Sequence, residues 1–230
     1  MLQPAGEPVA YTQMTGDDIS RANARLEAIE PLLNDLARSS IAHGHFALLY
    51  FHTVSRWRAY SRTCRQNEAL DLLIIGLFDK FDDYVLRLPR ERKPTSIRPW
   101  AGYLRRMSVA SPGWLSRILA LALAVRAHIR FDLAEAICEM HEVYSRRHGA
   151  PPDMAQFQKT ILDASAGLVF LAAWEDFVSG LANQGRFAGT VAVIAWPLGR
   201  IGLLVFQAMR RRAVHEALDS LRTARRIERP

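Results

Sequence analysis

Apolar residues recur every three or four positions along almost the whole chain after residue 15, which is the spacing of one face of an α-helix. In the first such segment Leu26, Ile29 and Leu33 fall on one face, and a capping box of Thr15 and Asp18 predicts where this helix begins. No segment keeps the two-residue alternation of a β-strand, and no internal repeat is visible. The pattern therefore predicts an all-α protein, a single-domain bundle of about seven or eight helices.

Proline, glycine and polar clusters divide this helical pattern into segments. We expect helices over residues 15–36, 40–60, 67–88, 114–144, 153–181 and 187–227, and a short helix after Pro99. The last long helix contains Pro197, which predicts an interruption. As domains, we expect a disordered segment over 1–14, a helical bundle over 15–185, and a Pro-interrupted apolar helix with a basic tail over 186–230, packed on the same bundle.

The net charge of +7 is concentrated at the C-terminal end of the chain. Nine arginines and three acidic residues after residue 185 give +6, whereas residues 1–185 are nearly neutral. A nucleic-acid-binding protein more often carries its positive charge as a stripe on the folded body. The arginines around Trp57 lie at the end of a predicted helix, where the helix dipole favours cations. We therefore expect no nucleic-acid partner.

The apolar stretch 190–209 has about the 20 residues that a membrane span needs. Arg200 at its centre would cost on the order of 2.5 to 3.5 kcal/mol in a bilayer. Three interpretations stay open: a core helix, a membrane span, or an interfacial helix whose basic tail touches anionic lipid. The N-terminus has no signal-peptide pattern, and Cys64 and Cys138 belong to no paired motif, so we expect a cytoplasmic protein with reduced thiols.

The strongest candidate site is the segment RAHIRFDLAEAI, residues 126–137. Its His128 and Asp132 are four positions apart, so on a helix they share the face of Leu121 and Val125. Burial lowers the pKa of an imidazole, and a neighbouring carboxylate raises it and fixes its tautomer, which prepares a general base or a metal ligand. Two structural alternatives stay open: Asp132 caps a new helix in a D-x-x-E pattern, or His128 is a hydrogen-bonded core residue.

The same segment resembles the signature N-A-H-I-x-[FY]-D-L-P-x-A-[LI] of an uncharacterised actinobacterial domain family of unknown function. The matched positions are His128, Ile129, Phe131, Asp132 and Leu133. Arg126 stands in place of the leading asparagine, and Ala134 in place of the proline. The resemblance also covers LLYFHTVSR (48–56), the IRPWAGYL stretch and the end of the chain, LGRIGLLVFQAMRRRAVHEALDSL. It implies a site at these residues and names no reaction.

A second candidate is FDKFDDY, residues 78–84. Asp79, Asp82 and Asp83 fall on one helix face, and such a cluster can bind Mg²⁺ together with substrate phosphates. It is similar, in reversed order, to the aspartate-rich motif of all-α isoprenoid synthases, although a second metal motif is not evident. The alternative is a solvated face whose charges are balanced by Lys80 and Arg87.

A divalent metal is the candidate cofactor, with His128 and Asp132 as ligands and His52 joining them from a facing helix. Tyr50, Trp57 and Arg126 are the candidate substrate contacts. The P-loop, G-x-G-x-x-G, H-E-x-x-H and G-x-S-x-G motifs are missing from the sequence.

These residues lead to three hypotheses for the function. The first is an enzyme, such as a cyclase of bacterial specialised metabolism, that acts on a small hydrophobic molecule in a bundle pocket. The second is a non-catalytic, membrane-peripheral or interaction protein that uses the helix over 190–229. The third is a magnesium-dependent isoprenoid-diphosphate enzyme that uses the aspartate cluster.

Overall fold

A computed structural model describes residues 16–39, 43–87, 99–108, 114–182 and 188–227. The regular elements within these ranges are all helical, which confirms the all-α prediction. The α-helices are α1 (Gly16–Ser39), α2 (Gly44–Ser61), α3 (Asn67–Phe81), α4 (Ala101–Met107), α5 (Trp114–Ala127), α6 (Leu133–His148), α7 (Met154–Leu162), α8 (Ala164–Ala182) and α9 (Ala188–Ile227). Two π-helical turns extend them, η1 (Asp82–Leu86) after α3 and η3 (His128–Asp132) between α5 and α6.

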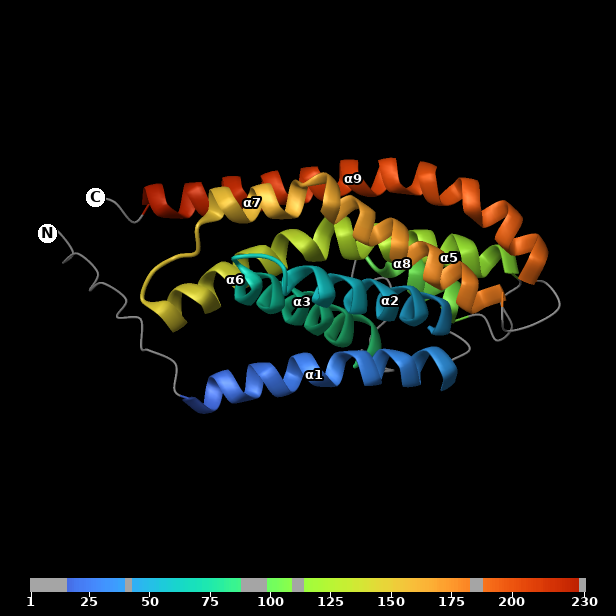
Figure 1. The fold of residues 1–230 in the computed structure, drawn as a ribbon, viewed down its shortest axis with the longest axis horizontal. Helices are drawn as coiled ribbons and strands as arrows, with labels where there is room; N and C mark the ends of the chain where they lie inside the picture. Colours follow the sequence, from blue (N-terminus) through green and yellow to red (C-terminus); the bar gives the residue numbers. More distant parts are fainter. Residues whose placement is uncertain (1–15, 40–42, 88–98, 109–113, 183–187, 228–230) are drawn as a thin grey trace, which may run out of the picture.

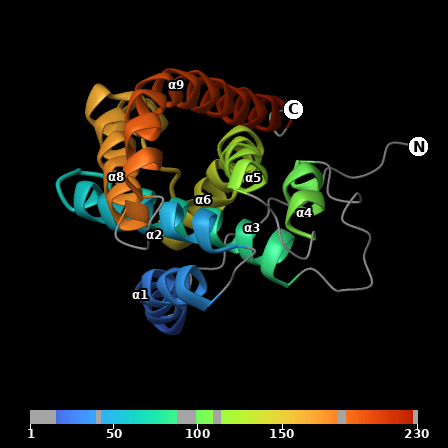
Figure 2. The ribbon, with the colours of Figure 1, turned by 90° about the vertical axis from the view of Figure 1, so that its right-hand side faces the viewer.

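The helices form an elongated bundle in which α1 and α9 lie on opposite sides (Figure 1). Helices α2, α3, α5, α6 and α8 lie between them, and the short helix α4 packs against α5 at one edge (Figure 2). Consecutive helices pack against each other, as α1 does with α2 and α8 with α9. Helices that are separated in the chain also pack together, as α3 does with α6. This arrangement encloses α2, α3 and η3 from several sides.

The buried side chains form two clusters rather than one continuous core. The first joins α1, α2, the end of α3, α4, α5 and α8, and it includes Phe46, Phe81 and Trp100. The second joins the start of α3 to α6, α7 and α9, and it includes Ile137 and Phe157. Since α2 and α3 pass from one cluster to the other, the space between the clusters is lined by these two helices.

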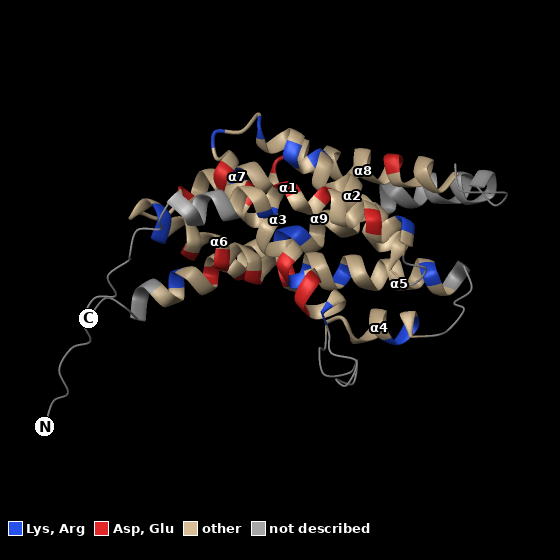
Figure 3. Cartoon of the chain, turned by 90° about the horizontal axis from the view of Figure 1, so that it is seen from below, with Lys and Arg blue, Asp and Glu red and all other residues tan. Residues whose placement is uncertain are grey.

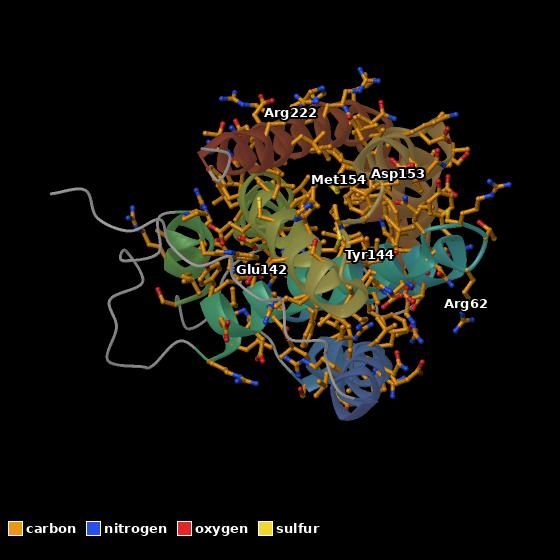
Figure 4. The ribbon with its side chains drawn as sticks, turned by 90° about the vertical axis from the view of Figure 1, so that its left-hand side faces the viewer. Arg62, Glu142, Tyr144, Asp153, Met154 and Arg222 are labelled. Carbon is orange, nitrogen blue, oxygen red and sulfur yellow. The ribbon has the colours of Figure 1, made fainter. Side chains whose placement is uncertain are left out.

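One predicted helix is two helices in the structure. Asp153 caps α7, because its side chain accepts hydrogen bonds from the backbone N–H groups of Ala155 and Gln156. Figure 4 looks onto this end of the bundle, where Asp153 and Met154 begin α7. The helix then stops at Asp163, whose ψ of 151° is not helical and whose carboxylate accepts from the Ser165 N–H to start α8. The prediction of one helix over 153–181 is therefore wrong.

The predicted interruption of the last helix at Pro197 is wrong, because α9 continues through this residue. The backbone is helical from Ala188 to Ile227, and Figure 1 shows α9 curving in its first part instead of breaking. A proline removes one backbone donor, and a helix can bend to accommodate it. Side chains over 188–201 lie outside the described part of the chain, as does Thr15, so the interpretation of 190–209 stays a prediction. Among the described residues, α8 is the helix that is long and apolar enough to cross a membrane.

Candidate functional site

The turn η3 joins α5 to α6 without a break, in the wider winding of a π-helix. Such turns occur inside α-helices and are frequent at functional sites. The turn directs His128 and Asp132 inward, where they are 4% and 1% exposed. It directs Arg130 outward, where its guanidinium pairs with Glu216 of α9 at 2.5 Å. The turn thus places two ionisable groups inside the bundle and anchors its outer side.

Inside the bundle, His128 and Asp132 form a hydrogen-bonded pair. The Nδ1 atom of His128 lies 3.1 Å from Oδ2 of Asp132. The indole N–H of Trp100, a fully buried residue, donates to both oxygens of the same carboxylate at 3.1 and 3.3 Å. Although Asp132 precedes α6, its side chain makes no capping bond, so the predicted capping alternative is wrong. The carboxylate instead accepts from two buried side chains.

Burial and hydrogen bonding act on Asp132 in opposite directions. Desolvation raises the pKa of its carboxyl above the ordinary value, and the hydrogen bonds from His128 and Trp100 lower it and so reduce the shift. Both donors favour the ionised carboxylate. In the neutral imidazole beside an ionised carboxylate, the proton lies on Nδ1 and the lone pair on Nε2. This is the arrangement in which a carboxylate fixes a histidine tautomer.

His128 is part of the wall of a cavity of about 80 Å³ that lies between the two core clusters. The wall is almost entirely apolar, and α2 contributes its longest side. The α2 residues of the wall are spaced by three and four along one face: Phe46, Leu49, Tyr50, Thr53, Val54 and Trp57. At 1.5 Å per residue they line about 16 Å of the cavity. A small volume along so long a wall makes the cavity narrow.

Three polar side chains of this wall carry buried atoms without a hydrogen-bond partner. They are Nε2 of His128, the hydroxyl of Tyr50, and Nε and Nη1 of Arg210. The ring of Tyr50 meets that of His128 edge-on, with centroids 4.6 Å apart. Burial and the nearby charges of Asp132 and Asp79 raise the pKa of Tyr50 well above its ordinary value, so its hydroxyl stays protonated. Buried polar atoms are rarely left without partners, and four of the seven such atoms among the described side chains lie on this one cavity.

The other predicted contacts separate into two groups. Tyr50 and Trp57 line the cavity, whereas Arg126 is exposed and does not. His52 lies two positions from Tyr50 on α2, which turns it toward α8, and its Nε2 is 3.7 Å from where a β-carbon on Gly180 would lie. It therefore does not join His128. In the described ranges no group of three His, Cys, Asp or Glu residues could hold a metal ion, so the predicted three-ligand set is not assembled.

Two of the three clustered aspartates, Asp79 and Asp82, are engaged in ion pairs, and Asp83 is exposed. Arg25 of α1 donates to Asp79 at 2.7 Å and to Asp82 at 3.2 Å, and Arg87 pairs with Asp82 at 2.8 Å. Lys80, which was expected to balance these aspartates, instead pairs with Glu139 of α6. Asp82 is buried, although the pattern predicted a solvated face. Figure 3 shows acidic and basic residues interspersed over the described helices on this side of the molecule. The cluster has the partners of a structural network that ties α1 to α3.

Two residues of the site were not predicted as site residues, Trp100 and Arg210. Trp100 stands in the IRPWAGYL stretch, which the family resemblance covers, but no spacing argument connects it to Asp132. Arg210 belongs to the basic tail that follows the apolar stretch 190–209, where the sequence predicts no site residue. Its register carried a signal, because it stands four positions after the buried Phe206 and four before the buried Val214. Because Arg210 stands on the apolar face of α9, its register predicts that the side chain is buried.

Both free cysteines, Cys64 and Cys138, are unpaired thiols, as predicted. Compared with known proteins, the chain matches no protein-family model, no curated protein and no solved structure.

Proposed function

We propose that the protein is an enzyme that acts on a small, largely apolar molecule, with His128 as the group that transfers a proton. The observation that carries this proposal is the state of its imidazole: Nδ1 is held by Asp132, and Nε2, on the other edge, has no partner on the wall of an apolar cavity. Most buried polar side-chain atoms have a hydrogen-bond partner, so a structural core histidine is expected to have one at each nitrogen. Here one nitrogen is oriented and the other is free to react.

In this proposal a substrate proton moves to the lone pair of Nε2, and the imidazolium that forms is stabilised by the carboxylate of Asp132. Trp100 positions that carboxylate by donating to both of its oxygens. The hydroxyl of Tyr50 is the neutral donor on the same wall, suited to an oxygen that gains negative charge. The apolar wall excludes water and strengthens each of these interactions.

A metal fits this cavity poorly, because structural and catalytic sites hold zinc with three or four protein ligands. The described cavity wall offers one imidazole, and its other titratable side chains are a phenol and an arginine. Proton transfer by His128 therefore suits the residues present better than metal ligation.

The proposal can be tested without knowing the substrate. The wild-type protein, His128→Gln and the control His52→Gln would each be incubated with a small-molecule extract of an actinobacterium, the group that the resemblance of the His128 segment indicates. Mass spectrometry would follow the compounds consumed and formed. We expect the wild type and His52→Gln to convert the same compound and folded His128→Gln to leave it unchanged. Conversion by all three proteins, or by none, would contradict the proposal.

A second candidate function, peripheral membrane binding, is favoured by the outer face of α9. Leu204 and Val205 are 68% and 54% exposed, and the same face continues one to two turns later with exposed Arg211 and Arg212. Leu168 of α8 is 61% exposed. Exposed apolar residues followed by arginines are typical of a helix that lies on anionic lipid.

Vesicle sedimentation separates this candidate from the enzyme. We expect the full chain to sediment with phosphatidylglycerol vesicles, and the double variant Leu204→Gln/Val205→Gln to stay in solution. Leu119→Gln is the matched control, since Leu119 is an exposed leucine on α5. Equal sedimentation of the double variant and the control would refute a membrane role for this face.

A further inference from the structure

Arg210 is the one buried arginine among the described residues, and it has no carboxylate partner there. It is 3% exposed, and no ion pair or hydrogen bond joins its guanidinium to any residue in the described part of the chain. Arg147, whose side chain is 7% exposed, also has two unpartnered nitrogens, but it pairs with Glu68; Arg58 pairs with Glu27 and Glu30. Arg210 instead lies over the ring of Phe206, 5.6 Å from its centroid. A buried cation without an anion is costly, so its retention calls for a reason.

The position of Arg210 gives that reason, because its side chain is part of the wall of the cavity that holds His128. Two of its three guanidinium nitrogens are buried and unpartnered. The remaining wall is apolar except for His128, Tyr50 and Thr53. Burial and neighbouring Arg211 lower the pKa of Arg210 to about 10, which still leaves it charged at neutral pH. Among its described wall residues, the cavity therefore presents one cation and no anion.

Arg210 and His128 lie toward different ends of the cavity. His128 contacts Phe46 and Tyr50 in the first half of α2. Arg210 is close enough to Tyr60, at the end of α2, and to Asp163 for their charges to act on it. Between the levels of Tyr50 and Trp57 the α2 wall rises about 10 Å. An anionic group at Arg210 would thus be separated from His128 by a length of apolar wall.

We propose that the cavity binds an unbranched aliphatic carboxylate, with its carboxylate on Arg210 and its apolar chain reaching toward His128. The elongated, apolar wall suits a single alkyl chain, and its side chains must move apart to admit one, because the cavity of about 80 Å³ is smaller than the roughly 150 Å³ of a cavity that binds benzene. A carboxylate carries the single charge that one guanidinium can neutralise, whereas a phosphate monoester would leave excess negative charge in an apolar site. This inference rests on the proposed function for the role of His128, and it adds the class of substrate and its orientation: the reacting position is remote from the acid group.

Binding can be measured with simple probes by isothermal titration calorimetry. The probes are hexanoate, octanoate and decanoate, their matched alcohols and amines, and octyl phosphate. We expect the carboxylates to bind and the amines not to bind. The alcohols should bind about ten- to a hundred-fold more weakly, because a hydrogen bond to a charged group contributes that factor. Alcohols that bind as tightly as the carboxylates would overturn the proposal, and octyl phosphate binding more tightly than octanoate would overturn its choice of head group.

Variants locate the binding at Arg210. Arg210→Met should lose about ten- to a hundred-fold in octanoate affinity. Arg211→Gln removes an exposed arginine from the same helix and should bind as the wild type does. Undiminished octanoate binding by Arg210→Met would overturn the proposal. If Arg210→Met does not fold, the Nε–H resonance of Arg210 in the wild type decides: it should shift with octanoate and not with octanol, and an unchanged resonance would overturn the proposal.

The two proposals fail separately. His128→Gln should still bind octanoate, since Arg210 holds the head group, while losing any conversion of a substrate. Octanoate binding without His128-dependent conversion would contradict the enzyme and leave the carboxylate site intact. His128-dependent conversion of a compound without an acid group, together with no octanoate binding, would contradict the carboxylate site and leave the enzyme intact.

Discussion

The hydrogen bond from Trp100 to Asp132 predicts a specific, pH-dependent loss of stability on Trp100→Phe. The substitution removes the indole donor that lies 3.1 and 3.3 Å from the two carboxylate oxygens and keeps an aromatic ring in the same buried position. A hydrogen bond to a charged group contributes about 1.5 to 3 kcal/mol. The smaller ring loses further packing, roughly 1 to 2 kcal/mol by comparison with truncations of buried aromatics. We expect the free energy of unfolding at pH 7 to fall by about 2.5 to 5 kcal/mol.

The charge-dependent part of this loss changes with pH in a known direction. The Trp100 donor favours the ionised carboxylate and lowers the pKa of Asp132, so its contribution is present at neutral pH and is lost as the pH falls through that pKa. Burial holds the pKa above the ordinary value of 3.8, so the loss occurs in mildly acidic solution. The cost of Trp100→Phe should therefore decrease as the pH is lowered toward 4, leaving the packing part.

Asp132→Asn gives a second measurement of the charge-dependent part of the stability that Trp100→Phe removes. The amide oxygen that it introduces can still accept from Trp100, but as a neutral acceptor in a bond of about 0.5 to 1.5 kcal/mol. In that background Trp100→Phe should cost about 1 to 1.5 kcal/mol less than in the wild type. Urea unfolding followed by far-ultraviolet circular dichroism measures all four proteins without relying on tryptophan fluorescence. A cost of Trp100→Phe that is the same at pH 7 and pH 4, and the same with and without Asp132→Asn, would refute the described pair.

Three further predictions concern single residues. Tyr50→Phe should leave the free energy of unfolding unchanged or raise it by up to about 1 to 3 kcal/mol, since the buried hydroxyl has no partner; a loss in urea unfolding would contradict this. Cys138 should react more slowly than Cys64 with a thiol reagent at pH 8, because burial and nearby carboxylates raise the pKa of its thiol; equal rates, measured by mass spectrometry of the labelled sites, would count against it. Magnesium with inorganic diphosphate should leave the thermal unfolding midpoint unchanged, because Arg25 already engages Asp79; a rise in the midpoint would revive the isoprenoid-diphosphate hypothesis.

The periodicity of the sequence was sufficient to predict the helices that form the bundle, because burial of one helix face leaves a mark at every third or fourth position. It was also sufficient to place His128 and Asp132 on one side of their segment. It did not reveal the π-helical turn at these residues, because the steps of four between the buried Ala124, His128, Asp132 and Ala136 are also a spacing that an α-helix allows. The break at Asp163 was missed for a similar reason: the apolar pattern continues across a single capping residue.

The remainder of the site depends on contacts between distant segments. Trp100 reaches Asp132 across 32 positions of the chain, and only the packing of α4 against α5 brings them together. The sequence favoured His52 because Tyr50 and Thr53 flank it, yet a helix turns residues two positions apart, such as Tyr50 and His52, to opposite sides. Arg210 shows the limit most clearly. Its charge suggested a solvent-exposed tail, whereas its register on α9 places it in the interior.

The tautomer of His128 tests the central claim most directly. Long-range ¹H–¹⁵N correlation spectra of histidine-labelled protein at pH 7 distinguish a protonated ring nitrogen from one with a free lone pair, and His128→Gln identifies the resonances. The structure predicts a proton on Nδ1, shared with Asp132, and a free lone pair on Nε2 at the cavity. A proton on Nε2 would contradict the account, because the atom proposed to accept the substrate proton would already carry one.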